Sequence, residues 1–210
     1  MLLALAGLKG GTGRTTLAVA LAAEAHARGR RTLLVDLDPR RDAHAWSLSA
    51  GNLAPPTLAL SGATGQAERL RALSLGHDLT VIDTPSDPEV LDAVLEVAEL
   101  ALLPCRPSPF DVWATGDAAQ ACLRARNLSN PRLQFAVIPN AVDPRTTLGA
   151  SLPEDLRALG LPVLNLVIRR RIAHAEAMAH GEPASAPDLV ELFETVEALQ
   201  AHCSTARQFH

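Results

Sequence analysis

Short apolar runs alternate with amphipathic stretches along the whole chain. Six of these runs are apolar almost throughout, which is typical of strands that are buried on both faces. The runs are Leu2–Leu8, Thr32–Asp38, Leu79–Pro85, Leu100–Cys105, Leu133–Ile138 and Pro162–Ile168. The pattern therefore predicts six buried strands, and no run approaches the about 18 residues that a membrane-spanning helix needs.

The stretches between these runs are predicted to be helical. A long helix is predicted at Thr15–Gly29, where the glycine favours a helix end, and a short one around Trp46. Further helices are predicted at Glu89–Val97, Val112–Arg126 and Thr147–Leu159, with two more at the C-terminal end. Gly51–Gly65 is rich in Pro, Gly, Ser and Thr and is expected to be irregular.

Buried strands that alternate with helices predict an α/β fold. We expect a single doubly wound, mostly parallel sheet with helices on both faces, the P-loop NTPase fold, with ligands at the carboxyl ends of the strands. The chain has 210 residues, 48% of them hydrophobic, and shows no repeat and no linker. One domain spanning residues 1–210 is therefore expected.

Composition narrows the functional classes. The formal net charge is −4, whereas proteins that coat duplex DNA are usually basic, so any nucleic-acid binding must come from a local patch. Cys105, Cys122 and Cys203 are far apart and predict neither a metal site nor a disulfide framework. The apolar start MLLALAGL leads directly into glycines, which favours a first strand over a signal peptide. We expect a cytoplasmic protein.

The stretch KGGTGRTT, residues 9–16, links the first predicted strand to the first helix. Its three glycines let backbone N–H groups turn inward around an anion, and the following helix adds the positive end of its dipole. Thr15 follows where a hydroxyl can bind Mg²⁺. The simple G-x-x-x-x-G-K-[ST] pattern nevertheless fails twice, because Leu8 and Arg14 occupy its first glycine and its lysine positions. Alone, such a turn is weak evidence for a nucleotide.

Aspartates at two further strand ends strengthen that evidence. Asp83 ends one predicted strand, where its carboxylate can hold Mg²⁺ through water. Asp36 and Asp38 lie on one side of a second predicted strand. Asp38 lies beyond the end of that strand, where it could orient an attacking water. Each aspartate alone could equally cap a helix or turn. Three such strand ends in this order are harder to explain by capping.

The motifs KGGTGRTT, VDLDPRRD, VIDTPSDP and LPCRPSPFDVWA resemble the ParA/MinD group of deviant Walker ATPases, and small ParA-type partition proteins most of all. The resemblance runs from residue 1 to about residue 200 and includes RRRIAHAEAMAHGEPA, residues 169–184. It implies an ATP-dependent homodimer that binds DNA non-specifically, is cytoplasmic and nucleoid-associated, and is reset by ATP hydrolysis. The implied roles are plasmid or chromosome partition or cargo positioning, together with a ParB-like or cargo-linked stimulating partner.

The resemblance also assigns roles to residues. Catalytic roles are implied for Lys9, Arg14 and Asp38. Thr15 is implied to bind Mg²⁺ directly, and Asp83 is implied to bind it through water. Phosphate and base contacts are implied for Lys9, Gly10, Gly11, Thr12, Gly13, Arg14, Thr15, Thr16 and Asn140. Lys9 matches the family's signature lysine, which reaches the partner's ATP. It is the only lysine in a chain with 19 Lys and Arg residues, and a planar guanidinium is expected to fit poorly between two facing sites.

Arg14 departs from the family, which has lysine at that position. Arginine keeps the charge but not the shape of the ammonium, although a general preference for arginine could also explain it. Three outcomes stay open: slow hydrolysis, binding without hydrolysis, or weakened nucleotide binding. The second outcome would make the chain a nucleotide-binding scaffold or regulator.

Candidate partner surfaces follow from two further segments. Arg169, Arg170 and Arg171 could contact DNA phosphates, with Arg145 as a lesser candidate, or could simply be a solvated helix start. No N-terminal DNA-reading domain is expected. A MinD-like membrane ATPase is the other alternative, but the predicted helix Asp188–His202 has an acidic polar face unsuited to anionic lipid. We expect that helix to pack on the body and expect no membrane partner.

Overall fold

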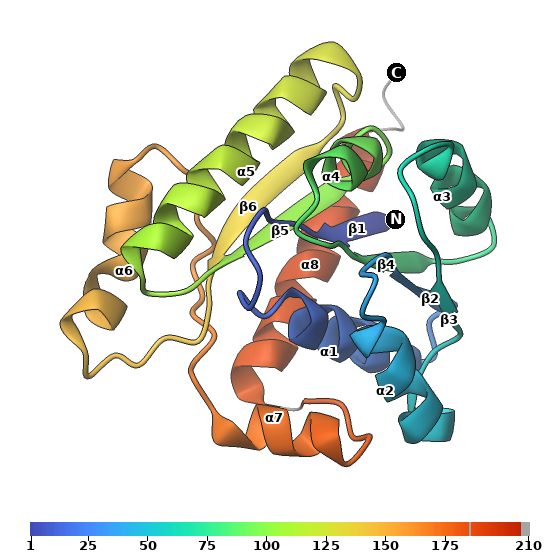
Figure 1. Cartoon of the computed structure of the whole chain (residues 1–210), viewed down its shortest axis with the longest axis horizontal. Helices are drawn as coiled ribbons and strands as arrows, with labels where there is room; N and C mark the ends of the chain where they lie inside the picture. The colour runs from blue at the N-terminus through green and yellow to red at the C-terminus, as the bar shows by residue number, and fades with distance from the viewer. Residues whose placement is uncertain (185, 207–210) are drawn as a thin grey trace.

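The computed structural model describes residues 1–184 and 186–206. Its centre is a parallel sheet of six strands in the order β3-β2-β4-β1-β5-β6 (Figure 1). The strands are β1 (Leu2–Leu5), β2 (Thr32–Asp36), β3 (Thr57–Ala59), β4 (Leu79–Asp83), β5 (Leu100–Cys105) and β6 (Gln134–Pro139). The expected α/β fold with a parallel sheet is confirmed.

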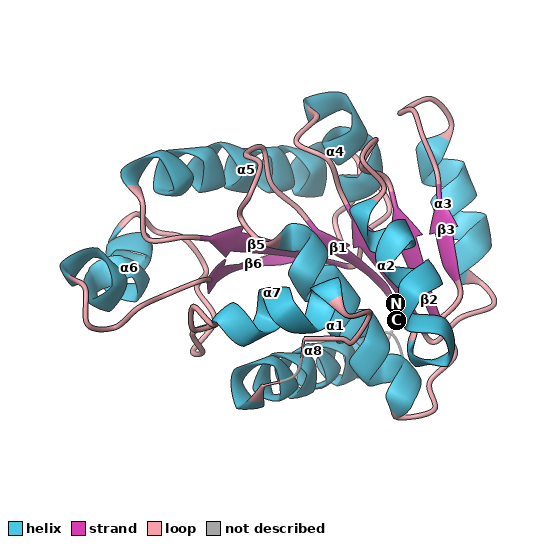
Figure 2. Cartoon of the chain, turned by 60° about the horizontal axis from the view of Figure 1, so that its bottom comes forward, coloured by secondary structure: helices cyan, strands magenta, loops and turns pink. Residues whose placement is uncertain are grey.

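Helices cover both faces of the sheet (Figure 2). They are α1 (Arg14–Ala27), α2 (Asp42–Ala50), α3 (Gln66–Ser74), α4 (Pro88–Leu95), α5 (Pro109–Leu128), α6 (Thr147–Ala158), α7 (Ile172–Ala179) and α8 (Pro187–Ala206), with a 3₁₀ turn, η1, at Gly51–Leu53. Helices α1, α2 and α8 pack on one face, and α3 to α6 pack on the other.

The continuous burial of the strands explains their apolar sequences. Successive side chains of β1 point to opposite faces, so that Leu3 and Leu5 join the core under α1 and α8, whereas Leu2 and Ala4 join the core under α4 and α5. Every residue of β1, β2, β4 and β5 is buried. Strands of this kind need no polar positions until the chain leaves the sheet.

Three local predictions differ from the structure. Pro162–Ile168 is not a strand: Val163 makes an isolated bridge to Val137 of β6, and the next bridge joins Arg169 to Val142, beyond the end of β6. Conversely, the stretch 51–65 contains the short strand β3, which pairs with β2. Helix α3 was not expected from the sequence, because it is rich in polar and charged residues and its only buried apolar residues are Ala67 and Leu70.

The C-terminal helix packs against the body, as expected. Leu192, Phe193 and Val196 of α8 are fully buried in the core beside α1. The acidic face of the helix meets Arg30, which donates a 3.0 Å hydrogen bond to Glu197. No helix in the described part of the chain is long and apolar enough to cross a membrane. Cys105 and Cys122 are free and buried, and the side chain of Cys203 lies outside the described residues.

Candidate functional site

The register of the sheet brings three strand ends together. Leu5, the last residue of β1, is paired with Asp83 of β4, and Asp83 is paired with Asp36 of β2. The loops that follow these strands therefore leave the sheet at the same level. Because parallel strands expose their carboxyl ends at one edge, the glycine-rich loop and the two aspartate segments form one site.

The glycine-rich loop after β1 has the backbone shape that an anion site needs. Gly11 and Gly13 have φ of +75° and +95°, a left-handed conformation that glycine adopts without strain. Helix α1 begins at the next residue, Arg14. A Cβ atom on Gly13 would also collide with the side-chain nitrogen of Asn140. Both the turn and the close approach therefore require glycine at position 13.

Asn140, which follows β6, braces this loop. Its Nδ2 donates a 2.6 Å hydrogen bond to the carbonyl oxygen of Thr12, and the residue is 6% exposed. The resemblance implies a contact with adenine for Asn140. Here its amide fixes the loop directly, which leaves its side-chain oxygen for a further partner.

Arg14 is buried inside the site, with only 6% of its surface exposed. Its Nη1 donates to the carbonyl oxygens of Gly7 and Pro85, and its Nη2 donates to Ser86 Oγ at 2.6 Å. Burial lowers the pKa of Arg14, and Asp83 and Asp38 oppose that effect. The guanidinium thus links the beginning of the glycine-rich loop to the loop after β4, a link that sequence reasoning missed.

Asp83 is the least compensated charge in the site. It is 1% exposed, and neither carboxylate oxygen has a formed hydrogen bond among the described residues. Burial raises its pKa to about 7, although the nearby Thr15 hydroxyl opposes the shift. A buried, unpartnered carboxylate beside a hydroxyl suits a hydrated Mg²⁺. No cluster of three or more His, Cys, Asp or Glu residues in the described part of the chain could hold a metal, so the remaining ligands would be water and phosphate.

The two aspartates after β2 have different environments. Asp36 is fully buried, and its carboxylate accepts backbone N–H bonds from Asp38 at 3.0 Å and His44 at 2.9 Å. It therefore fixes the loop and the start of α2. The Asp38 side chain is 15% exposed and accepts a 2.9 Å bond from the backbone of Arg40. Of the two, Asp38 is the one that can reach a water molecule.

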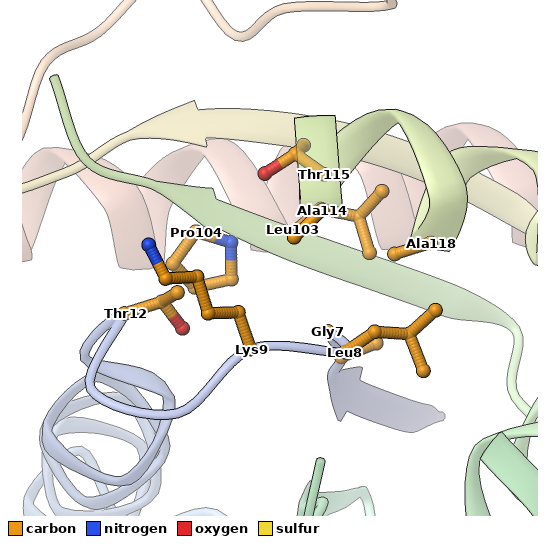
Figure 3. A pocket seen from close by; sticks show the side chains of 10 residues that line it. Gly7, Leu8, Lys9, Thr12, Leu103, Pro104, Ala114, Thr115 and Ala118 are labelled. Carbon is orange, nitrogen blue, oxygen red and sulfur yellow. The ribbon is translucent and has the colours of Figure 1, made fainter. Parts of the chain in front are cut away.

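Lys9 is held by a buried carboxylate on α5. Its Nζ lies 2.5 Å from Asp111 Oδ2, and the Asp111 side chain is 0% exposed. The other carboxylate oxygen accepts a 3.1 Å bond from Arg106 Nε. Burial alone would raise the pKa of Asp111, but the bonds from Lys9 and Arg106 hold it below its usual value. Figure 3 shows Lys9 extending from its loop towards Thr12 and the end of β5 at Pro104.

An aromatic pair is exposed beside Lys9. Phe110 and Trp113 are each 66% exposed and pack edge to face with ring centroids 5.4 Å apart. The Lys9 ammonium lies 5.8 Å from the Phe110 ring. The sequence-predicted lysine is therefore near an apolar surface at the rim of the site.

A cavity of about 240 Å³ extends from the glycine-rich loop towards the C-terminal region. It is lined by loop residues, by Asn140 and by four arginines, Arg106, Arg169, Arg170 and Arg171, with no acidic residue among its lining. The Arg171 Nε lies 3.5 Å from Asp188, whereas the side chains of Arg169 and Arg170 have no ion pair among the described residues. The three arginines expected to contact DNA therefore also border the candidate phosphate site. Arg145 does not line this cavity and pairs with Asp143 in its own loop.

Comparison with known proteins agrees with this geometry. The family model for the CobQ/CobB/MinD/ParA nucleotide-binding domain matches residues 3–184. The chain belongs to this family. It is 32% identical over 184 residues to maintenance of carboxysome distribution protein A from Halothiobacillus neapolitanus, covering 85% of this chain and 84% of that protein. It is also 32% identical over 213 residues to the chromosome-partitioning ATPase Soj from Thermus thermophilus, covering 86% and 85%.

Solved structures share the fold. The ATP complex of a McdA variant from Cyanothece superposes with a TM-score of 0.77, at 20% identity, over 95% of this chain and 96% of that chain. Cobyrinic acid a,c-diamide synthase from Mycobacterium smegmatis, with a bound ATP analogue and magnesium, gives 0.75 at 22% identity, over 96% and 94%. The ParA/MinD relationship that the motifs indicate is confirmed, and homologous structures hold ATP, an ATP analogue or ADP, several of them with magnesium.

The burial of Asp83 makes a prediction about pH. In the unfolded chain this carboxyl titrates near pH 4, whereas in the folded protein it keeps its proton up to about pH 7. The folded state therefore binds more protons between these values, and stability falls as pH rises through this window. Asp83→Asn should raise the unfolding free energy of the nucleotide-free protein by about 4 kcal/mol at pH 8 and by almost nothing at pH 4.

Thermal melting from pH 4 to pH 8 measures this difference, and the same variant should lose the Mg²⁺-dependent part of its ATP affinity. Arg14 attracts Asp83, so a variant that is less stable than the wild type at pH 8 would mean that this attraction outweighs the cost of burial. A pH-independent gain would show that the carboxyl does not titrate in this range.

Proposed function

We propose that this chain is a ParA-like ATPase that partitions DNA or positions another cargo. The observation that supports it best is the sheet register, which brings the glycine-rich loop, Thr15 and Asp83 to one strand edge beside Asp38. The family relationship supports ATP as the ligand. A capping role does not explain the carboxylate of Asp83, because neither of its oxygens accepts a hydrogen bond among the described residues.

In the proposed reaction, water attacks the γ-phosphate in line, and catalysis comes from positioning and from stabilisation of charge. The backbone N–H groups of residues 11–16 bind the phosphates, and Asp38 orients the water. The Thr15 hydroxyl would hold Mg²⁺ directly, and Asp83 would hold it through water. When bound, Mg²⁺ neutralises charge on the phosphate oxygens. Arg14 stabilises developing charge from within the subunit, after exchanging its carbonyl partners for phosphate oxygens.

A homodimer completes the proposed site. Lys9 lies at the rim of the site, 33% exposed, beside the exposed Phe110 and Trp113. An ammonium and an aromatic pair at one edge suit a contact with the same edge of a second copy, which would bring each lysine to the nucleotide of the other subunit. Nucleotide occupancy then controls dimer formation, and hydrolysis reverses it.

The proposed track is DNA, bound by phosphate contacts without sequence reading. Arg170 is exposed and its side chain has no ion pair among the described residues. With Mg²⁺ and ATP, affinity for a random duplex should fall steeply between 50 and 200 mM salt, and Arg170→Ala should reduce the slope of log K against log salt by about 1. Fluorescence anisotropy at several salt concentrations measures this slope.

ATP affinity is measured in the same variants, because Arg170 lines the cavity beside the phosphate loop. Arg69→Ala is the matched control, since Arg69 is exposed on α3, away from that cavity. A wild-type protein that binds ATP but no DNA at 50 mM salt would refute the DNA track. An unchanged slope in Arg170→Ala would refute this surface alone.

A second candidate function is a nucleotide-dependent scaffold or regulator that does not hydrolyse ATP. The observation in its favour is that Arg14 is held by three hydrogen bonds within the subunit, two of them to carbonyl oxygens. Measurement of phosphate release with saturating DNA separates the two functions. A MinD-like membrane ATPase is less well supported, because the apolar face of α8 is used in the core, and liposome flotation tests it.

The relatives indicate only the general class of the cargo and of the stimulating partner. One relative is named for carboxysome distribution and the other for chromosome partition. We propose a cargo-linked, ParB-like protein as the partner that stimulates hydrolysis. It would raise phosphate release in the presence of DNA, whereas a scaffold would show no such response.

A further inference from the structure

Arg106, in the loop between β5 and α5, has an orientation that the roles above do not use. Its Nε donates to Asp111 at 3.1 Å, so the carboxylate anchors the inner edge of the guanidinium. Neither Nη atom donates a hydrogen bond to any residue in the described part of the chain. The side chain is 39% exposed. The two free nitrogens are therefore available to a ligand.

The free edge of Arg106 lies against the phosphate loop. Its Nη1 lies 3.8 Å from the position that a Cβ atom would occupy on Gly11. Arg106 also lines the cavity of about 240 Å³ together with Gly13, Thr16 and Asn140. A guanidinium with two free donors next to inward-facing backbone N–H groups is suited to phosphate oxygens, which it can bind in a bidentate manner.

The charge balance of the site favours the same ligand. Asp111 is a single buried carboxylate shared by two cations, Lys9 and Arg106, which leaves a net positive charge at this corner. The charge of Arg14 is directed towards Gly7, Pro85 and Ser86. The site therefore lacks a compact ammonium in the same subunit at the position where the family has lysine, and Arg106, in the loop after β5, is a second cation beside the glycine-rich loop.

We propose that Arg106 binds the phosphate chain of the nucleotide held in its own subunit, with Asp111 as its positioning residue. This inference rests on the proposed nucleotide site and adds a residue to it. The ligand class is a nucleoside di- or triphosphate. Arg106 supplies part of the positive charge that a loop lysine would otherwise supply, and Asp111 fixes the guanidinium plane so that little side-chain entropy is lost on binding.

The test is titration of Mg²⁺ and a fluorescent ADP analogue into the full-length protein. ADP is used because a contact within one subunit should affect nucleotide affinity even without ATP-dependent dimerisation. Arg106→Gln should weaken ADP binding about tenfold, the size expected for a charge-assisted hydrogen bond. Arg106→Lys should recover part of the loss, and Arg69→Ala should bind like the wild type. Thermal melting verifies that the variant folds, because Arg106→Gln also removes one of the two charged partners of the buried Asp111.

A double-mutant cycle tests the positioning role. If Asp111 acts through Arg106, then Asp111→Asn should weaken ADP binding in the wild type but cost much less in the Arg106→Gln background. Additive effects would refute the positioning role. Unchanged ADP binding by Arg106→Gln would refute the contact, and a loss confined to ATP-dependent dimerisation would place it across the interface instead. Failure of the wild type to bind ADP would overturn the nucleotide site itself.

Discussion

Arg14→Lys is expected to increase the ATP turnover of this protein at least about tenfold, with little change in ATP affinity. The guanidinium of Arg14 is tied to Gly7, Pro85 and Ser86, and it has to leave these partners before it can contact phosphate. An ammonium on a flexible stem needs no such exchange and presents a compact charge to the transferring phosphoryl group. A tenfold gain corresponds to about 1.4 kcal/mol of the barrier.

Phosphate release at saturating ATP, with and without DNA, measures this effect. Arg14→Ala is the opposite extreme and should weaken ATP binding about 100-fold, because it removes the charge from the interior of the site. Ser86→Ala removes the hydrogen bond from Arg14 to Ser86 Oγ and should give a smaller gain in turnover than Arg14→Lys. If lysine gives no gain, the identity of residue 14 does not limit the reaction. If the wild type and Arg14→Lys both bind ATP and neither hydrolyses it, the scaffold function is supported.

Lys9→Ala is expected to abolish ATP-dependent dimerisation. Light scattering measures this: the molar mass of the wild type should double with Mg·ATP and should remain that of a monomer with Mg·ADP or without nucleotide. The variant should have the mass of a monomer under all three conditions. The reason is that the ammonium at the rim supplies the charge that the partner's phosphates require. The variant should also lose about 1 kcal/mol of stability, because Asp111 keeps only Arg106 as a charged partner.

Two further variants separate the ammonium from its ion pair. Asp111→Asn breaks the same ion pair but keeps Lys9, and at saturating ATP it should still double in mass. Lys9→Arg keeps the charge but introduces a wide planar group, and it should fail to dimerise. Trp113, exposed beside Phe110, gives an independent fluorescence signal for contact at this edge. A Lys9→Ala variant that dimerises normally would remove this residue from the interface.

The fold was largely predictable because buried parallel strands leave a simple pattern. Strands such as Leu79–Asp83 are apolar up to the residue at which they leave the sheet. The segment 162–168 has the same pattern, and its side chains are likewise divided between the two cores, with Leu166 in one and Val163 in the other. Its backbone nevertheless pairs with β6 only in an isolated bridge at Val163, so it does not join the sheet as a strand. Apolar spacing reports burial, and burial alone does not require hydrogen bonding to a neighbouring strand.

The arrangement of the candidate site was predictable where polar residues follow a strand end, and less so elsewhere. Gly13, Thr15 and Asp83 follow from loop motifs, and their arrangement depends only on the parallel register. The link from Arg14 to Ser86 depends on the reach of one long side chain, which no motif encodes. Asp111 was not predicted, because it lies just before the helix expected at Val112–Arg126, where an acidic residue is common. One available signal was its place within an otherwise apolar first turn, close after Arg106.

The ion pair between Lys9 and Asp111 has a mechanical consequence. Lys9 precedes α1, which packs on one face of the sheet, and Asp111 belongs to α5, which packs on the other. The ion pair therefore connects the two helical layers across the carboxyl edge of the sheet. If Lys9 moves to contact a second subunit, this connection is broken in both molecules at once. Pairing two subunits would then free each one to shift its own layers relative to each other.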